Sequence, residues 1–161
     1  MKMKKTFLAS VTAVALAAAM VPAVALAADN HETKVNYEVS EGYTWTVPAS
    51  VTFDANASTD TKTPDDKVTV SSNVIAAGKS TQISLSANNT FKVISAENAT
   101  RDFTVGKDAS STLKAGESVL TVPSGTASGE QALTFKLLAP QNGVLQAGTY
   151  TGIVGYTAAL V

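Results

Sequence analysis

Apolar and polar residues alternate one by one along much of the chain. Side chains at every second position of an extended segment share a face, so this period of two predicts β-strands with one buried face. The pattern recurs in ten stretches: 34–39, 43–47, 50–53, 67–72, 81–86, 91–95, 102–105, 118–122, 132–138 and 149–161. No 3.6-residue period separates them, so we expect no helix between the strands.

The connections between these stretches indicate the class of fold. They carry Gly, Asn, Asp, Pro and Ser, the residues that turns select. Spacings of about 8–15 residues without helices argue against an α/β architecture. We predict an all-β fold, an antiparallel immunoglobulin-like β-sandwich of about seven to nine strands, with a jelly roll as the alternative. The stretch 71–81 is less regular. An alternative for it is a further strand through Val74 and Ile75, with Gly78 in the turn.

The last stretch is the longest. From Thr149 onward, one face carries Tyr150, Gly152, Val154, Tyr156, Ala158 and Leu160. In a self-contained sandwich this strand pairs with neighbours from its own chain, which is the arrangement we favour. In a polymerising subunit, an extended segment of a partner fills an open groove instead. Residues 28–39 are the segment of this chain suited to that second arrangement.

The N-terminus predicts export. Lys2, Lys4 and Lys5 precede an apolar stretch that ends at Ala25-Leu26-Ala27, and these are the three parts of a secretory signal peptide. We therefore expect a signal peptide over residues 1–27, a single β-sandwich domain over 28–161, and a secreted or cell-surface location. We expect no membrane anchor after signal cleavage.

Composition excludes several functions. Without residues 1–27 the chain carries nine basic and thirteen acidic residues, a formal charge of −4, and has no basic patch for nucleic acid. It contains no cysteine, so disulfides and zinc–thiolate sites are excluded. Stability must come from apolar burial and ladder hydrogen bonds.

The most polar stretch is a candidate metal site. Residues 54–67 lack large apolar side chains, and their aspartates offer the oxygen ligands that Ca²⁺ prefers: Asp54, Asp60, Asp65 and Asp66. Lys62 and Lys67 interrupt this set, and its spacing fits no calcium loop. A solvated loop is the alternative that we favour.

Two aromatic residues are candidates for ligand binding. Tyr43 and Trp45 lie two residues apart, and exposed rings of this kind stack on sugars. They also share a face that continues into Val47, Val51 and Phe53. Such a stripe more often belongs to the core, where each ring contributes about 1.5–3 kcal/mol by burial.

No constellation for catalysis stands out. His31 is the single histidine and lies next to the predicted cleavage point, where nothing orients an imidazole for acid–base work. We therefore expect no enzymatic activity and no cofactor.

Two motifs resemble known families. "AGTYTGIVGYTAALV" (147–161) and "YTWTVPASVTF" (43–53) resemble small secreted immunoglobulin-like surface proteins of Gram-positive bacteria, some of them near the WxL cell-wall-binding group. The terminal strand also resembles that of pilins. The chain departs from the WxL pattern, since its one related motif is Trp45-Thr46-Val47, and from chaperone–usher pilins, since it lacks their cysteine pair.

The predicted signal peptide, the succession of strands and the absence of a catalytic constellation together indicate the function that we expect. We expect a secreted, non-enzymatic module of the cell surface or extracellular matrix, structural or adhesive in role. The alternatives are a carbohydrate or cell-wall-polymer binding module and a pilin-like subunit that polymerises by strand exchange. The expected partners are thus cell-wall polymer, glycan or other surface proteins, together with self-association.

Overall fold

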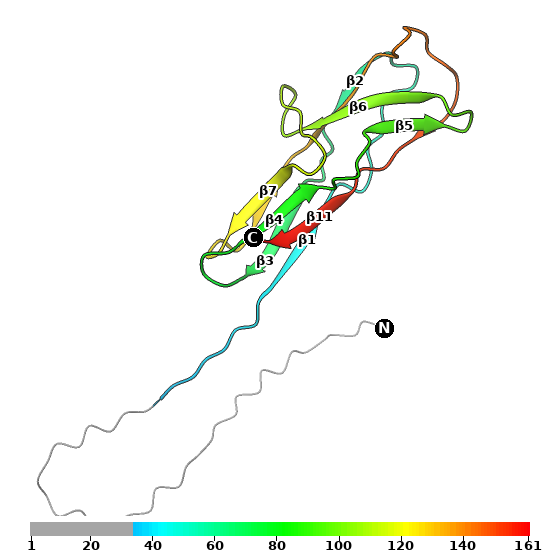
Figure 1. The fold of residues 1–161 in the computed structure, drawn as a ribbon. Helices are drawn as coiled ribbons and strands as arrows, with labels where there is room; N and C mark the ends of the chain where they lie inside the picture. Colours follow the sequence, from blue (N-terminus) through cyan, green and yellow to red (C-terminus); the bar gives the residue numbers. More distant parts are fainter. Residues whose placement is uncertain (1–33) are drawn as a thin grey trace, which may run out of the picture. The chain divides into compact units, whose positions relative to one another are not determined.

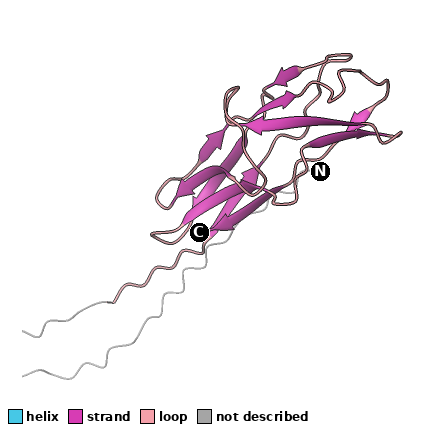
Figure 2. Ribbon diagram, turned by 45° about the horizontal axis from the view of Figure 1, so that its top comes forward, coloured by secondary structure: helices cyan, strands magenta, loops and turns pink. Residues whose placement is uncertain are grey.

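The computed structural model describes residues 34–161 (Figure 1). Residues 38–161 form one compact unit, and 34–37 belong to the other unit of the chain. The predicted signal peptide and His31 lie outside the described residues. Within the described part the chain contains only strands and loops (Figure 2). The all-β prediction is confirmed, and no described helix is long and apolar enough to cross a membrane.

Eleven strands form three antiparallel sheets within the described residues. The first sheet has the order β1 (Gly42–Thr46), β3 (Val68–Val74), β8 (Gly129–Gln131). The second has the order β11 (Tyr156–Leu160), β4 (Ser80–Leu85), β7 (Ser118–Pro123). The third has the order β10 (Tyr150–Thr151), β5 (Lys92–Ser95), β6 (Thr100–Gly106), β9 (Thr134–Leu137), β2 (Asp60–Lys62).

One apolar core joins the three sheets. Every second residue of the strands supplies it, as the period of two requires. The buried members are Val68, Val70, Ile83, Leu85, Phe103, Val105, Val119, Val122, Leu133, Phe135 and Leu137. The interior is thus built from alternate side chains of packed antiparallel sheets, as the sequence pattern predicts.

One buried amide ties two of the sheets together. Asn73, in β3, donates from Nδ2 to the carbonyl oxygens of Pro123 (3.1 Å) and Thr126 (2.9 Å). Its Oδ1 accepts from the hydroxyl of Thr81, in β4, at 2.7 Å. Thr81 is fully buried. The amide therefore gives the buried hydroxyl of Thr81 its acceptor and links β3 to the turn that follows β7.

The C-terminal stretch is divided, not continuous. β10 and β11 are separated by residues 152–155, where the chain leaves β5 and joins β4. Asn89 fixes this crossover, because its Oδ1 accepts from Gly155 N (2.7 Å) and its Nδ2 donates to Gly155 O (2.9 Å). The favoured prediction that this stretch pairs with its own chain is confirmed for both strands.

Two predicted strands are not formed. Residues 34–39 and 50–53 alternate in sequence, yet neither belongs to a sheet of the described chain. Conversely, the predicted loop 54–67 contains β2, which pairs with β9. Both unpaired stretches contribute to the proposals made below.

Candidate functional site

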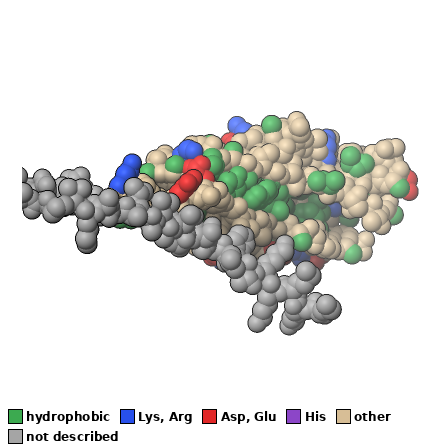
Figure 3. Space-filling view, turned by 90° about the horizontal axis from the view of Figure 1, so that it is seen from below, with side chains coloured by type: hydrophobic (Ala, Val, Ile, Leu, Met, Phe, Trp, Pro, Cys, Tyr) green, Lys and Arg blue, Asp and Glu red, His purple; other side chains and the backbone are tan. Residues whose placement is uncertain are grey.

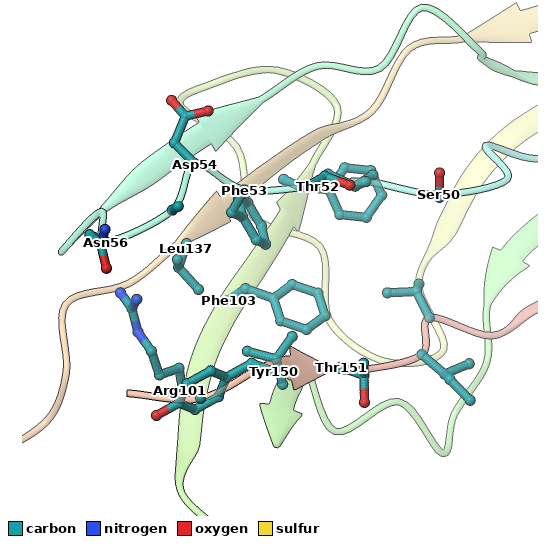
Figure 4. A pocket seen from close by; sticks show the side chains of 18 of the residues that line it. Ser50, Thr52, Phe53, Asp54, Asn56, Arg101, Phe103, Leu137, Tyr150 and Thr151 are labelled. Atoms are coloured by element: carbon teal, nitrogen blue, oxygen red, sulfur yellow. The ribbon is translucent and has the colours of Figure 1, made fainter. Parts of the chain in front are cut away.

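A groove of about 820 Å³ runs between two segments of the compact unit. Residues 48–56 form one side, and residues 145–154 form the other. Between them lie side chains from β5, β6 and β9 (Figure 4). The volume lies within the range of ligand-binding clefts, about 300–1,000 Å³.

The floor of the groove is apolar. Phe103 is buried there, with its ring centroid 6.5 Å from that of Phe53 and 6.0 Å from that of Phe91. The second pair meets edge to face at 89°, a favourable geometry for aromatic rings. Val93 and Leu137 complete this floor. A ligand that lies in the groove therefore meets hydrocarbon on the floor and polar groups along the sides.

Each side of the groove includes main chain that has no partner among residues 34–161. None of the main-chain hydrogen bonds in the described chain involves residues 48–53, or Ile153 and Val154. Along the first side, Val51 and Phe53 are half-buried and Thr52 is exposed, as in a strand that faces a core. This segment belongs to no sheet, and its N–H and C=O groups are available for pairing with another chain.

Local sequence explains why these edges stay unpaired. Pro48 lies two residues after the end of β1 and has no N–H to continue the ladder with β3. On the other side, Gly152 passes so close to β5 that an added Cβ would lie 2.4 Å from the carbonyl oxygen of Lys92. Ile153 then projects outward and is 86% exposed. Apolar side chains reach the protein surface on one side of the described chain (Figure 3).

Arg101 closes one end of the groove. Its guanidinium donates to the carbonyl oxygens of Ala57 (2.9 Å), Leu138 (2.8 Å) and Ser58. It forms no ion pair with any described carboxylate, and its buried Nε has no hydrogen-bond partner there. Arg101 thus fixes the loop 54–59 onto β6 and holds the first side of the groove in place.

The structure brings together two of the four aspartates predicted to bind calcium. Lys62 Nζ lies 2.7 Å from Asp54 Oδ1 and 3.4 Å from Asp60 Oδ2. Asp60 also accepts from Asp54 N and Thr61 N, both at 2.7 Å, and the bond from Asp54 N is the main cause of its lowered pKa. The ammonium group of Lys62 therefore pairs with both carboxylates and offsets one of their two negative charges.

The other two aspartates lie elsewhere in the loop. Asp65 and Asp66 are exposed in the bend before β3, without an ion pair or side-chain hydrogen bond to described residues. Among residues 34–161, no group of three or more acidic, histidine or cysteine side chains is placed to hold a metal ion.

Tyr43 and Trp45 do not border the groove. Both lie in β1, are half-buried, and pack against the apolar core. Of the two interpretations of these rings, as core residues or as sugar-stacking residues, this placement agrees with the first. The aromatic rings at the groove are instead those of phenylalanines from other strands and of Tyr150 and Tyr156.

The phenol of Tyr156, which lines the groove, makes the stability of the fold depend on pH. Burial raises the pKa of its phenol to about 12, from an unfolded value of about 10. Since the folded state holds this proton more tightly, the associated stability is present below pH 10 and is lost between about pH 10 and pH 12. We expect a late phase near pH 12 in an absorbance titration of tyrosine, and we expect Tyr156→Phe to remove it. A late phase that persists in this variant would contradict the assignment.

Sequence reasoning missed the groove, although its signals were present. They are the proline after β1 and the glycines of 148–155, which interrupt two otherwise regular alternations. No model of a known protein family matches the chain, and no curated protein matches it.

Proposed function

We propose that this protein is an exported, non-enzymatic binding module whose groove accepts an extended polypeptide as an added β-strand. The observation that carries the proposal is the pairing of an apolar floor with unpaired main chain on both sides. Strand addition uses these two features together, because main-chain hydrogen bonds supply affinity and pockets for alternate side chains supply specificity.

The wider assignment follows from the sequence. Export rests on the predicted signal peptide, and an immunoglobulin-like sandwich is the arrangement to which we assign the packed antiparallel sheets. The resemblance to Gram-positive surface proteins and pilins supports an adhesive or structural role at the cell surface. Within this role, a peptide is a better ligand for the groove than a sugar, because the rings on its floor pack against one another and its sides present main-chain groups.

Selection from a random peptide library tests the proposal. Linear seven-residue peptides displayed on phage are selected on the purified protein, and synthetic copies are measured by fluorescence polarisation. We expect selected sequences with apolar residues at alternate positions. Methylation of those main-chain nitrogens of the peptide that face a groove edge should weaken its binding at least tenfold. The methyl group removes a hydrogen-bond donor and leaves the side chains of the peptide intact.

A matched pair of variants locates the binding. Ile153→Asp places a charge at the side of the groove, and we expect it to weaken binding about tenfold or more. Val74→Asp makes the same change at another exposed apolar residue, outside the groove, and should leave binding unchanged. Equal effects of the two substitutions, or binding that tolerates N-methylation, would contradict strand addition in this groove.

A further inference from the structure

We infer that the occupant of the groove is residues 34–39 of a second copy of this chain, so that copies join by strand exchange. The inference rests on the proposed function and names its ligand. Four observations carry it: the surface chemistry of the segment 34–39, its length, the reach of the chain, and the contacts that hold the start of β1.

The segment 34–39 has the chemistry of a donor strand. It belongs to no sheet among the described residues, yet it alternates apolar and polar side chains. All three of its apolar members are exposed: Val35 at 84%, Tyr37 at 90% and Val39 at 53%. Burial of such side chains in an apolar groove is strongly favourable.

Donor and acceptor have the same length. Six residues in extended conformation, 34–39, span about 20 Å at about 3.3 Å per residue. The unpaired side of the groove, residues 48–53, also has six residues. The donor can therefore run along the whole of this edge, where every second residue of a strand turns its N–H and C=O toward its neighbour and Pro48 lacks an N–H.

A copy cannot fill its own groove with this segment. Only Ser40 and Glu41 separate 34–39 from β1, so folding back would form a hairpin in which residue 39 lies opposite 42 and residue 34 lies opposite 47. Such a hairpin ends one residue before Pro48, where the groove begins. The donor must therefore come from another molecule.

The start of β1 is also anchored in a way that opposes folding back. Glu41 Oε1 accepts from Ala76 N at 2.6 Å, and its two oxygens lie 3.2 Å from Lys79 Nζ. The pKa of Glu41 is lowered, first by the hydrogen bond from Ala76 N. These contacts hold the side chain of Glu41, which a turn at residues 40 and 41 would have to accommodate.

Association in solution tests the inference. The exported protein is purified and followed by sedimentation velocity over a range of concentrations. We expect oligomers that grow with concentration. The donor variant Val35→Asp/Tyr37→Asp should weaken association by about 100-fold or more, since each buried apolar side chain accounts for at least a tenfold change. The control Asn36→Asp adds a carboxylate on the other face of the segment and should associate like the unmodified protein.

Mixing two defective variants gives a sharper result. The donor variant keeps its groove, and Ile153→Asp keeps its donor segment, so each has one working half. We expect either alone to be monomeric and the mixture to form dimers that do not grow further. Oligomers that persist in either variant alone, or unmodified protein that stays monomeric, would overturn strand exchange into this groove.

A labelled peptide with the sequence of residues 34–39 separates the two proposals. We expect it to bind the donor variant, whose groove is free, and to bind Ile153→Asp at least tenfold more weakly. If peptides selected from the library bind in the groove and this peptide does not, strand exchange is overturned and the proposed function stands. If neither kind of peptide binds, both proposals fail.

Discussion

Replacing Asn73 with leucine should lower the free energy of unfolding by about 3 kcal/mol. Leucine has a similar size, so the main effect is the loss of hydrogen bonds. Thr81 loses the acceptor of its fully buried hydroxyl, and the carbonyl of Thr126 loses its donor, whereas the carbonyl of Pro123 still accepts from Thr126 N. Each buried polar group left unpaired costs about 1–3 kcal/mol. Urea denaturation followed by circular dichroism measures the change.

A double substitution tests whether the hydroxyl is the cause. Thr81→Val removes the group that Asn73→Leu leaves unpaired, so the two changes together should cost less than their sum by about 1 kcal/mol. Ser71→Ala, at an exposed position of the same strand, should change stability by about 0.5 kcal/mol or less. A cost below about 1 kcal/mol for Asn73→Leu, or strict additivity with Thr81→Val, would contradict this role.

The buried position of Asn73 illustrates what an alternation pattern cannot show. Val68 and Val70 are buried and predict an inward position at 72, but residue 73 is the buried one. Ser72 has a positive φ of 54°, and the register of β3 with β1 is irregular at this point. This irregularity, of the kind found at β-bulges, shifts the phase by one residue and turns a polar side chain inward. Nothing in the local sequence marks it.

Long, regular alternations were predictable because each depends on local information. The predicted stretch 81–86 corresponds closely to β4, whose buried residues alternate as the sequence predicts. The stretch 118–122 gives the bounds of β7 to within one residue, but Val119 and Val122 are its buried residues and lie three apart, where the register with β4 shifts. The stretches 34–39 and 50–53 have the same local signal but lack a partner. Pairing depends on where the rest of the chain lies. A local alternation shows that a segment can form a strand, and it does not show whether another strand lies beside it.

The candidate site was less predictable than the fold for a related reason. A groove requires two segments about 100 residues apart, 48–56 and 145–154, to lie on either side of one aromatic floor. The sequence identified aromatic and acidic residues by type, and it located Tyr43 and Trp45 on a strand. It did not show that the rings at the groove come from β6 and the segments beside it.

Replacing Phe103 with alanine should lower the free energy of unfolding by about 4 kcal/mol, the largest effect that we predict. The side chain is buried at the point where core and groove floor meet, and large-to-small changes of this kind cost about 3–5 kcal/mol. The ring also has the geometry of an aromatic pair with Phe91, which adds about 0.5–1.5 kcal/mol beyond burial.

Phe103→Leu is the matched control, because it keeps most of the buried hydrocarbon and removes only the aromatic contacts. We expect it to cost about 1–2 kcal/mol, measured in the same urea titrations.

The two variants also test whether the proposed ligand binds against this part of the core. A strand that binds only the folded protein stabilises it by mass action, so a selected peptide should raise the unfolding midpoint of Phe103→Leu. A cost below about 2 kcal/mol for Phe103→Ala would show that the floor of the groove is not part of the core.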